Sequence, residues 1–298
     1  VSIDGIVCLN ISNDCQEKRF SNRVECPICN MPGVSGESCA KHGIKITGVC
    51  NRTCNFCNEE GDMKGIDMVV VDSKFYETVS ALQSHFGIKR IMLTGGESTI
   101  HSEILDIINN IIAEDISITT NGIRPVPLEH WKRMKESGLS RVIFSIHDAN
   151  PQDFLRLESQ AKSIGWAFAS LENQKSNCYK ACSSGLNVRV NIVAYSNADK
   201  VMSVINMLSD IQSEFGLRIR ILNDLSRIES SRNNIKTICQ KLGAIKNSET
   251  LRKASSNKVE TWVSESGMVF ETKEEYPYYL DGICQNCSVK NICHEGFY

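Results

Sequence analysis

Residues 44–57 read IKITGVCNRTCNFC, and they hold the most informative pattern in the chain. A short apolar strand over 44–48 leads into a loop that carries Cys50, Cys54 and Cys57. Three thiolates can bind three irons of a four-iron cluster and leave the fourth iron open, whereas a fourth thiolate would close the cluster. An open coordination position is typical of a catalytic metal site. The stretch therefore predicts an enzyme.

The middle of the chain alternates short apolar strands with amphipathic helices, which is the pattern of parallel β/α units. We expect strands over 44–48, 89–94, 116–120, 141–146, 187–193 and 217–222. Helices between them are indicated by apolar residues at helical spacing, such as Val201, Val204, Ile205 and Leu208. Six such units predict an α/β fold, a partial (β/α)6 barrel of parallel strands. Right-handed crossovers place the C-terminal ends of all these strands on one rim, where we expect the site.

Polar residues follow the expected strands at this rim. After the second strand, Gly95 and Gly96 allow a ligand to approach the backbone, and Glu97 can accept a hydrogen bond from an ammonium group. The later strands contribute Thr119, Thr120, Asn121, Gly122, Ser145, His147, Arg189 and Asn191. Structural alternatives stay open for three of them: Arg189 as a surface cation, Asn191 as a satisfied core amide and His147 as a structural histidine.

The spacing C-x3-C-x-aromatic-C, with Phe56 in the aromatic position, resembles that of the radical S-adenosylmethionine (SAM) enzymes. The resemblance implies that SAM chelates the free iron and that one electron cleaves it to methionine and a 5′-deoxyadenosyl radical, which abstracts a substrate hydrogen. It also implies an external one-electron donor such as flavodoxin or ferredoxin. By the same resemblance, the methionyl amino group is held by Gly95, Gly96 and Glu97, and the ribose and carboxylate of SAM are contacted by Thr120, Ser145, Arg189 and Asn191.

A second cysteine group, Cys284, Cys287 and Cys293, follows an expected hairpin built from 259–266, a turn at Gly267 and 268–272. Its spacing, C-x2-C-x5-C, resembles the Twitch and SPASM extensions, and the shorter Twitch type fits better. The resemblance implies a second four-iron cluster on a small β-hairpin cap over the open end of the barrel. Candidates for its fourth ligand are Cys178, Cys182 and Cys239, for which simple burial is the alternative.

The chain also resembles the GTP cyclase group of molybdopterin biosynthesis. The resemblance lies in TTNG at 119–122, VRVN at 188–191 and the three C-terminal cysteines. However, the C-x2-C-x13-C spacing and the glycine-rich tail of that group are absent. We therefore expect a substrate other than GTP.

The first 43 residues hold a third group, formed by Cys26, Cys29, Cys39 and His42. Thiolates and an imidazole on two short loops are the ligands that tetrahedral zinc prefers, so zinc is the hypothesis for this segment. Two alternatives stay open. One is a further iron–sulfur cluster that recruits Cys8 or Cys15, and the other is a cysteine-rich arm packed beside the barrel.

Length and composition indicate how the chain is divided into domains and which classes of protein are excluded. The 298 residues and 41% hydrophobic content allow one large domain with appendages, which we place at 1–43, 44–225 and 226–298. Fourteen cysteines in a long chain without a visible secretion leader favour metal over disulfides. A net charge of −2 argues against a nucleic-acid partner, and no apolar run reaches membrane-spanning length. These features predict a cytoplasmic protein.

Together these patterns predict a radical SAM enzyme that acts on a small polar metabolite, such as a nucleoside, nucleotide or sugar of a biosynthetic pathway. Two alternatives are kept. The chain modifies a peptide by the same chemistry, or it is a non-catalytic iron–sulfur sensor or scaffold. The reaction outcome, whether dehydrogenation, cyclisation or rearrangement, is left open.

Overall fold

The computed structural model describes residues 2–3, 6–8, 41–55, 57, 69–86, 88–195, 197–224, 227–252 and 257–275. Several predicted site residues lie outside these ranges: Cys26, Cys29, Cys39, Phe56, Cys284, Cys287 and Cys293. Their roles stay predictions. The backbone of His42 belongs to the first barrel strand, which begins at Lys41, three residues earlier than expected.

The described residues form one eleven-stranded sheet in the order β1-β2-β3-β4-β5-β6-β7-β8-β11-β10-β9. The strands are β1 Ser2–Ile3, β2 Ile6–Cys8, β3 Lys41–Thr47, β4 Arg90–Gly95, β5 Asp115–Thr120, β6 Leu139–Ser145, β7 Asn187–Val193, β8 Arg218–Leu222, β9 Ile245–Arg252, β10 Asn257–Val263 and β11 Val269–Glu275. The central six, β3 to β8, pair in parallel and in sequence order. The expected partial barrel of parallel strands is therefore confirmed.

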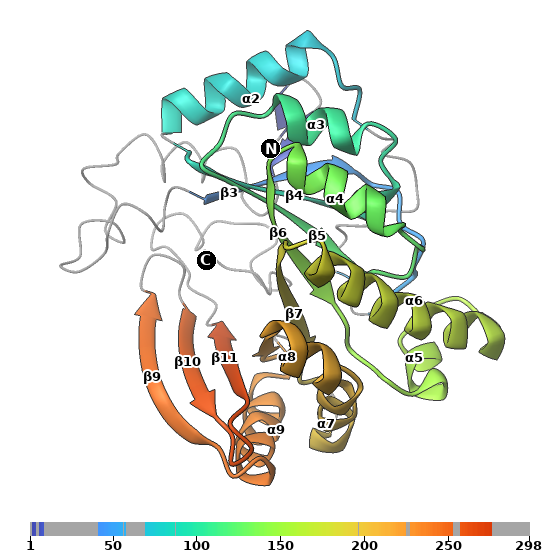
Figure 1. Ribbon diagram of the computed structural model, residues 1–298, viewed down its shortest axis with the longest axis vertical. Coiled ribbons are helices and arrows are strands. Elements are labelled where there is room, and N and C mark those ends of the chain that lie inside the picture. Colours follow the sequence, from blue (N-terminus) through green and yellow to red (C-terminus); the bar gives the residue numbers. More distant parts are fainter. Residues whose placement is uncertain are drawn as a thin grey trace, which may run out of the picture.

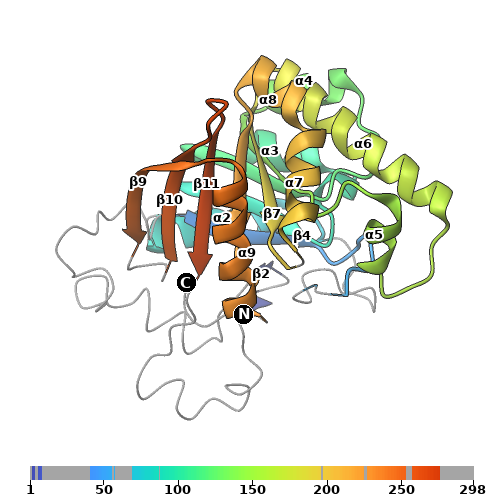
Figure 2. The same ribbon diagram turned by 90° about the horizontal axis from the view of Figure 1, so that it is seen from below.

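Helices cover one face of this curved sheet, as Figures 1 and 2 show. They are α2 Ser73–Phe86, α3 Ile104–Asn110, α4 Leu128–Glu136, α5 Pro151–Arg156, α6 Ile164–Ser183, α7 Ala198–Met207, α8 Ser209–Phe215 and α9 Ile228–Lys241, with a 3-10 turn at Ser98–Ile100. None of the described helices combines the length and apolar character needed to cross a membrane.

Alternation along each strand explains why the helices pack on one face only. In β7, Val188, Val190 and Ile192 are buried in the same core as Val201 and Val204 of α7. Burying an aliphatic side chain of this size contributes about 1.5–3 kcal/mol, so the apolar face determines where the helix docks. The alternate residues of β7 lie on the concave face, away from the helices. Polar side chains are therefore left for the interior of the barrel.

Side chains at helix starts fix where three helices begin after their strands. The side-chain oxygen of Asn150 accepts from the backbone N–H groups of residues 152 and 153 at the start of α5, and Pro151 occupies the first helical position. Ser163 caps α6 and Asn197 caps α7 in the same way. Since α5 begins only a few residues after β6, its cap places the segment that follows it beside the rim.

The C-terminal hairpin was expected to cap the barrel, and the structure refines this expectation. β10 and β11 pair around a turn at Gly267, where φ is 82°, so the hairpin itself is confirmed. However, β11 pairs in parallel with β8, and β9 adds a third strand, so the hairpin extends the barrel sheet. Without β11, the edge of β8 would carry unpaired backbone N–H and C=O groups, and pairing with β11 satisfies them. The boundary placed at 225 stays a prediction, although this sheet runs across it.

Candidate functional site

The three-cysteine loop leaves the end of β3 at the rim. Cys50 and Cys54 are partly buried and Cys57 is exposed. Two N–H groups point at the Cys50 sulfur, the backbone N–H of Arg52 at 3.4 Å and the side-chain amide of Asn121 at 3.8 Å. Such donors stabilise a thiolate and tune the potential of a cluster bound to it.

Burial dominates the electrostatics of the loop thiols. It raises the pKa of Cys54 to about 12, and it also raises the pKa of Cys50 above its ordinary value. Among the smaller causes at Cys54, the charge of Arg52 lowers the pKa, whereas the charges of Glu158, Cys50 and Cys57 raise it. Within the described residues, no three His, Cys, Asp or Glu side chains converge on a single-ion site. Thiolates bound to separate irons of a cluster need no such convergence, and three cysteines on one loop are the donor set for a four-iron cluster with one open iron.

Gly95 and Gly96 bring the turn after β4 against the start of the cysteine loop. A Cβ at Gly95, where φ is 152°, would lie 2.2 Å from the carbonyl oxygen of Thr47, and one at Gly96 would lie 2.3 Å from that of Val49. The backbone N–H of Gly96 donates to Thr47 at 2.9 Å, and that of Glu97 donates to Val49 at 2.9 Å. The close approach that these glycines permit is therefore, first of all, between the ends of two neighbouring strands.

Glu97 is 1% exposed, and its carboxylate is surrounded by donors. Oε1 accepts from the backbone N–H and the hydroxyl of Thr99 at 3.0 and 2.6 Å, and from the hydroxyl of Thr120 at 2.6 Å. Oε2 accepts from the backbone N–H of Asn121 at 2.6 Å. Two residues that the sequence placed in one SAM site, Glu97 and Thr120, are thus in direct contact.

Ser145, Asn191 and Arg189 lie on the neighbouring strands β6 and β7. Ser145 pairs in register with Asn191, whereas Arg189 pairs with Ile143, two residues before the Ser145–Asn191 pair. The Nε of Arg189 and the Oδ1 of Asn191 are buried, and neither has a hydrogen-bond partner among the described residues. Burial, with the charge of Arg220 as the next cause, lowers the pKa of Arg189 to about 9. A guanidinium and an amide oxygen two residues apart on one face are suited to a ligand that carries an anionic group and a hydroxyl.

The rim also holds His147, which the sequence treated as structural rather than catalytic. Its Nδ1 accepts from the backbone N–H of Val193 at 3.2 Å. Burial, helped by the charge of Arg52, lowers the pKa of His147 to about 3, so the ring is neutral. This geometry supports a structural role.

Sequence reasoning missed a hydrogen-bonded pair at the rim, formed by Asp148 and Tyr195. The Tyr195 hydroxyl donates to the Asp148 carboxylate. Burial raises the pKa of Asp148 to about 6, even though this hydrogen bond acts in the opposite direction. No periodicity or spacing marks these residues, because the two join only when β6 and β7 lie side by side.

Sequence reasoning also missed Gln174 of α6. Its amide donates to the carbonyl of Asn121 at 2.6 Å and to that of Ser145 at 3.4 Å. One buried helix side chain therefore holds the ends of β5 and β6 together. Nothing in the local sequence distinguishes it from any other glutamine on an amphipathic helix.

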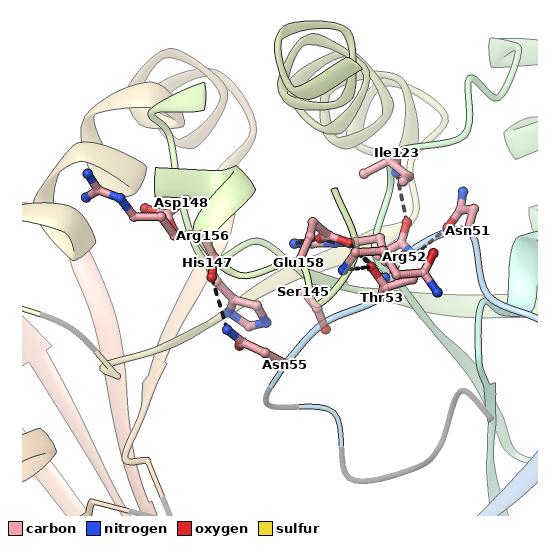
Figure 3. A network of polar contacts seen from close by, with 12 residues as sticks. Asn51, Arg52, Thr53, Asn55, Ile123, Ser145, His147, Asp148, Arg156 and Glu158 are labelled. Carbon is pink, nitrogen blue, oxygen red and sulfur yellow. Dashed lines mark hydrogen bonds and ion pairs between the residues drawn. The ribbon is translucent and has the colours of Figure 1, made fainter. Parts of the chain in front are cut away.

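The largest feature missed by sequence reasoning is an ion pair between Arg52 and Glu158, shown in Figure 3. Glu158 Oε1 accepts a hydrogen bond from Nε of Arg52 at 2.7 Å and forms an ion pair with Nη2 at 2.6 Å. Its Oε2 accepts from the backbone N–H and the hydroxyl of Thr53 at 2.7 and 3.0 Å. The two charged side chains are 2% and 0% exposed. The cysteine loop is thus held by a residue that follows α5.

The candidate fourth ligands of a second cluster lie elsewhere. Cys178 and Cys182 are on α6, which is helical as expected, and Cys239 is on α9. All three belong to the core between the sheet and the helices. The Cys178 and Cys182 thiols hydrogen bond to each other, which raises the pKa of Cys178. This placement supports the burial interpretation.

The Radical SAM superfamily matches the chain over residues 44–207. The chain is 27% identical over 176 residues to GTP 3′,8-cyclase of Aquifex aeolicus, covering 56% of this chain and 52% of that protein. It is 30% identical over 173 residues to a probable GTP 3′,8-cyclase of Methanocaldococcus jannaschii, covering 56% and 54%. The chain thus spans about half the length of these curated relatives.

A solved structure shares the fold. Streptococcus suis SuiB, bound to the precursor peptide SuiA, superimposes with a TM-score of 0.53 and 15% identity, covering 78% of this chain and 52% of that one. The family match includes more than half of the chain and confirms the expected family. The chain belongs to the radical SAM superfamily, whose members are enzymes that use a [4Fe–4S] cluster and S-adenosylmethionine.

Proposed function

We propose that Cys50, Cys54 and Cys57 bind the SAM cluster of this chain, and that the enzyme removes a hydrogen atom from a small polar metabolite such as a nucleoside, nucleotide or sugar. When bound, the cluster supplies the electron that cleaves SAM to methionine and the 5′-deoxyadenosyl radical. The residues of the chain bind SAM and the substrate, hold them in a fixed orientation and exclude water.

The contact set of Asn121 carries this proposal. Its side-chain amide lies 3.8 Å from the Cys50 sulfur and 2.7 Å from Asn51 Oδ1. Its backbone N–H donates to Glu97, which also binds Thr120. Residues expected to bind iron and residues expected to bind SAM therefore meet at one point of the rim. Such proximity is what ligation of one iron by SAM requires.

The unsatisfied groups on β7 support the placement of the rest of SAM. We assign the SAM carboxylate to the guanidinium of Arg189, because its Nε is buried without a partner in the described part of the chain. We assign a ribose hydroxyl to Asn191 Oδ1 for the same reason. Ser145, in register with Asn191, adds a hydroxyl beside it.

Similarity to proteins named GTP 3′,8-cyclase over 56% of the chain supports a nucleotide-like substrate. A second four-iron cluster on Cys284, Cys287 and Cys293, and an electron donor of the flavodoxin or ferredoxin type, belong to the same proposal. Zinc binding by Cys26, Cys29, Cys39 and His42 is a separate prediction.

Anaerobic reconstitution tests the assignment of the cluster. Protein with dithionite and SAM is expected to yield 5′-deoxyadenosine, and SAM is expected to change the electron paramagnetic resonance (EPR) signal of the reduced cluster. Cys54→Ala should abolish both, whereas Cys239→Ala, in the helix-side core, should retain both. A Cys54→Ala protein that still makes 5′-deoxyadenosine would contradict the proposal.

A panel of deuterated nucleosides, nucleotides and sugars tests the substrate class. Transfer of deuterium from one class into 5′-deoxyadenosine identifies the hydrogen that the enzyme removes. Transfer from a labelled peptide, with none from the panel, would favour the peptide alternative instead.

A further inference from the structure

Two chain segments 105 residues apart run beside each other at the cysteine loop. The backbone N–H of Asn55 donates to the carbonyl of Leu157 at 2.8 Å, and that of Ser159 donates to the carbonyl of Thr53 at 2.6 Å. Between these bonds, Cys54 and Glu158 form an antiparallel β-bridge. The middle cysteine of the motif therefore lies inside a short two-stranded pairing.

The charges of Arg52 and Glu158 lie at the centre of this pairing. One Glu158 oxygen accepts a hydrogen bond from Arg52 Nε and forms an ion pair with Nη2, and the other oxygen accepts two hydrogen bonds from Thr53. The guanidinium also stacks 4.2 Å from the centre of the Phe154 ring, which belongs to α5. In the described part of the chain, the hydrogen-bond donors to this carboxylate come from Arg52 and Thr53, two of the three residues between Cys50 and Cys54.

Such a buried pair is a poor source of net stability. Desolvation of two charges offsets most of their attraction, and an apolar pair of similar volume is often as stable or more stable. The geometry of the pair, by contrast, is restrictive, because three directed hydrogen bonds and the ion-pair contact fix both the depth and the register of the loop. The arrangement is therefore better explained by positioning than by stabilisation.

We propose that Arg52 and Glu158 are positioning residues for the iron–sulfur cluster. They hold the loop so that Cys54, fixed in the β-bridge, and Cys50, whose sulfur accepts from the Arg52 N–H, keep the separation that a cluster requires. This inference rests on the proposed ligation by Cys50, Cys54 and Cys57. It adds the 154–160 segment, which carries none of the three cysteines, to the cluster site.

The decisive comparison replaces the ion pair by apolar residues. The double variant Arg52→Met with Glu158→Leu roughly keeps the side-chain volume and leaves no charge unpaired. Its unfolding temperature is therefore expected to equal or exceed that of the parent protein. If the pair only stabilises the fold, the cluster should then behave as in the parent. If the pair positions the loop, the cluster should be held less firmly despite the intact fold.

The measurement is release of iron from the reconstituted holoenzyme to an excess of chelator, followed by absorbance. We expect the double variant and the single variant Glu158→Gln to release iron about 10–100-fold faster than the parent, the range found when residues that orient metal ligands are altered. Hydrogen exchange of residues 50–55 should rise in both, with exchange in α6 and β7 unchanged. The control double variant Lys89→Met with Glu114→Leu removes an exposed, remote ion pair of 3.1 Å and should release iron at the parental rate.

The outcomes separate the two proposals. A parent protein that holds no SAM-responsive cluster would overturn the proposed function and this inference with it. A parent that holds the cluster, with the apolar double variant releasing iron at the parental rate, would overturn the positioning role alone. Glu158→Gln can fail to fold because the Arg52 charge is left unpaired, and the apolar double variant then decides the question.

Discussion

The side-chain amide of Asn121 donates toward the Cys50 sulfur, which joins the end of β5 to the cysteine loop that follows β3. The same residue binds Glu97 through its backbone N–H, so three strand ends meet around one asparagine. An N–H group directed at a ligating sulfur stabilises the more negative, reduced state of a cluster.

Asn121→Ala removes this donor while leaving the backbone contact to Glu97 in place. We therefore expect a lower reduction potential of the cluster and roughly tenfold slower formation of 5′-deoxyadenosine, in line with the effect of losing a residue that supports a metal ligand. An EPR-monitored potentiometric titration measures the first quantity, and a single-turnover assay measures the second. Asn110→Ala, a surface amide on α3, should change neither.

Glu97→Gln tests whether the buried carboxylate must accept four hydrogen bonds. The glutamine side chain has one acceptor oxygen, so its NH2 group must face at least one donor that the carboxylate now binds. We expect a loss of about 1–3 kcal/mol in the free energy of unfolding, together with weaker binding of SAM. Denaturant titration and equilibrium dialysis give the two values. Unchanged values in both would show that the network tolerates an amide.

Gly95→Ala should be among the most damaging changes of small volume. The new Cβ would lie 2.2 Å from the Thr47 oxygen, at a backbone φ of 152° that side chains rarely adopt. We expect a loss of at least about 2 kcal/mol of stability and poor retention of iron, since the cysteine loop starts three residues after Thr47. Gly216→Ala is the matched control, because φ is also positive there (66°) but no atom lies within 4 Å of the new Cβ. The control should lose only about 1 kcal/mol.

Cys178→Ala and Cys182→Ala test the alternative that these thiols complete a second cluster. Both side chains lie in the core on the helix side of the sheet, so each change should leave the iron and sulfide content per chain unchanged. Each should cost about 1 kcal/mol of stability, the usual cost of a small core deletion. Loss of iron in either variant would revive the ligand interpretation.

The raised pKa of Asp148 predicts a pH-dependent stability. Burial raises this pKa to about 6, while the Tyr195 hydroxyl and Lys200 act against the shift. Because the folded state retains the proton up to a higher pH than the unfolded chain, this group makes folding less favourable as pH rises from about 4 to about 6. Asp148→Asn should remove the slope and add at most about 3 kcal/mol at pH 7. Urea titrations of both proteins at pH 4.5, 6 and 7.5, values chosen to span this window, measure the difference.

Much of the barrel followed from sequence patterns. The six parallel strands were predicted with bounds that differ from the observed ones by a few residues, since a strand such as β7 alternates Val188, Val190 and Ile192 with polar residues. The addition of β11 to β8 could not be foreseen, because strand pairing between distant segments leaves no periodicity in either one.

The sequence by itself determined the family of the chain and the residues that we propose for its chemistry. The spacing of Cys50, Cys54 and Cys57 and the polar ends of the strands follow from local order along the chain. Only the tertiary structure decided how the loop is held, because Arg52 and Glu158 are two ordinary charged residues until α5 brings them together. Burial then removes the solvent that would screen them, and the donors of Arg52 and Thr53 converge on one carboxylate.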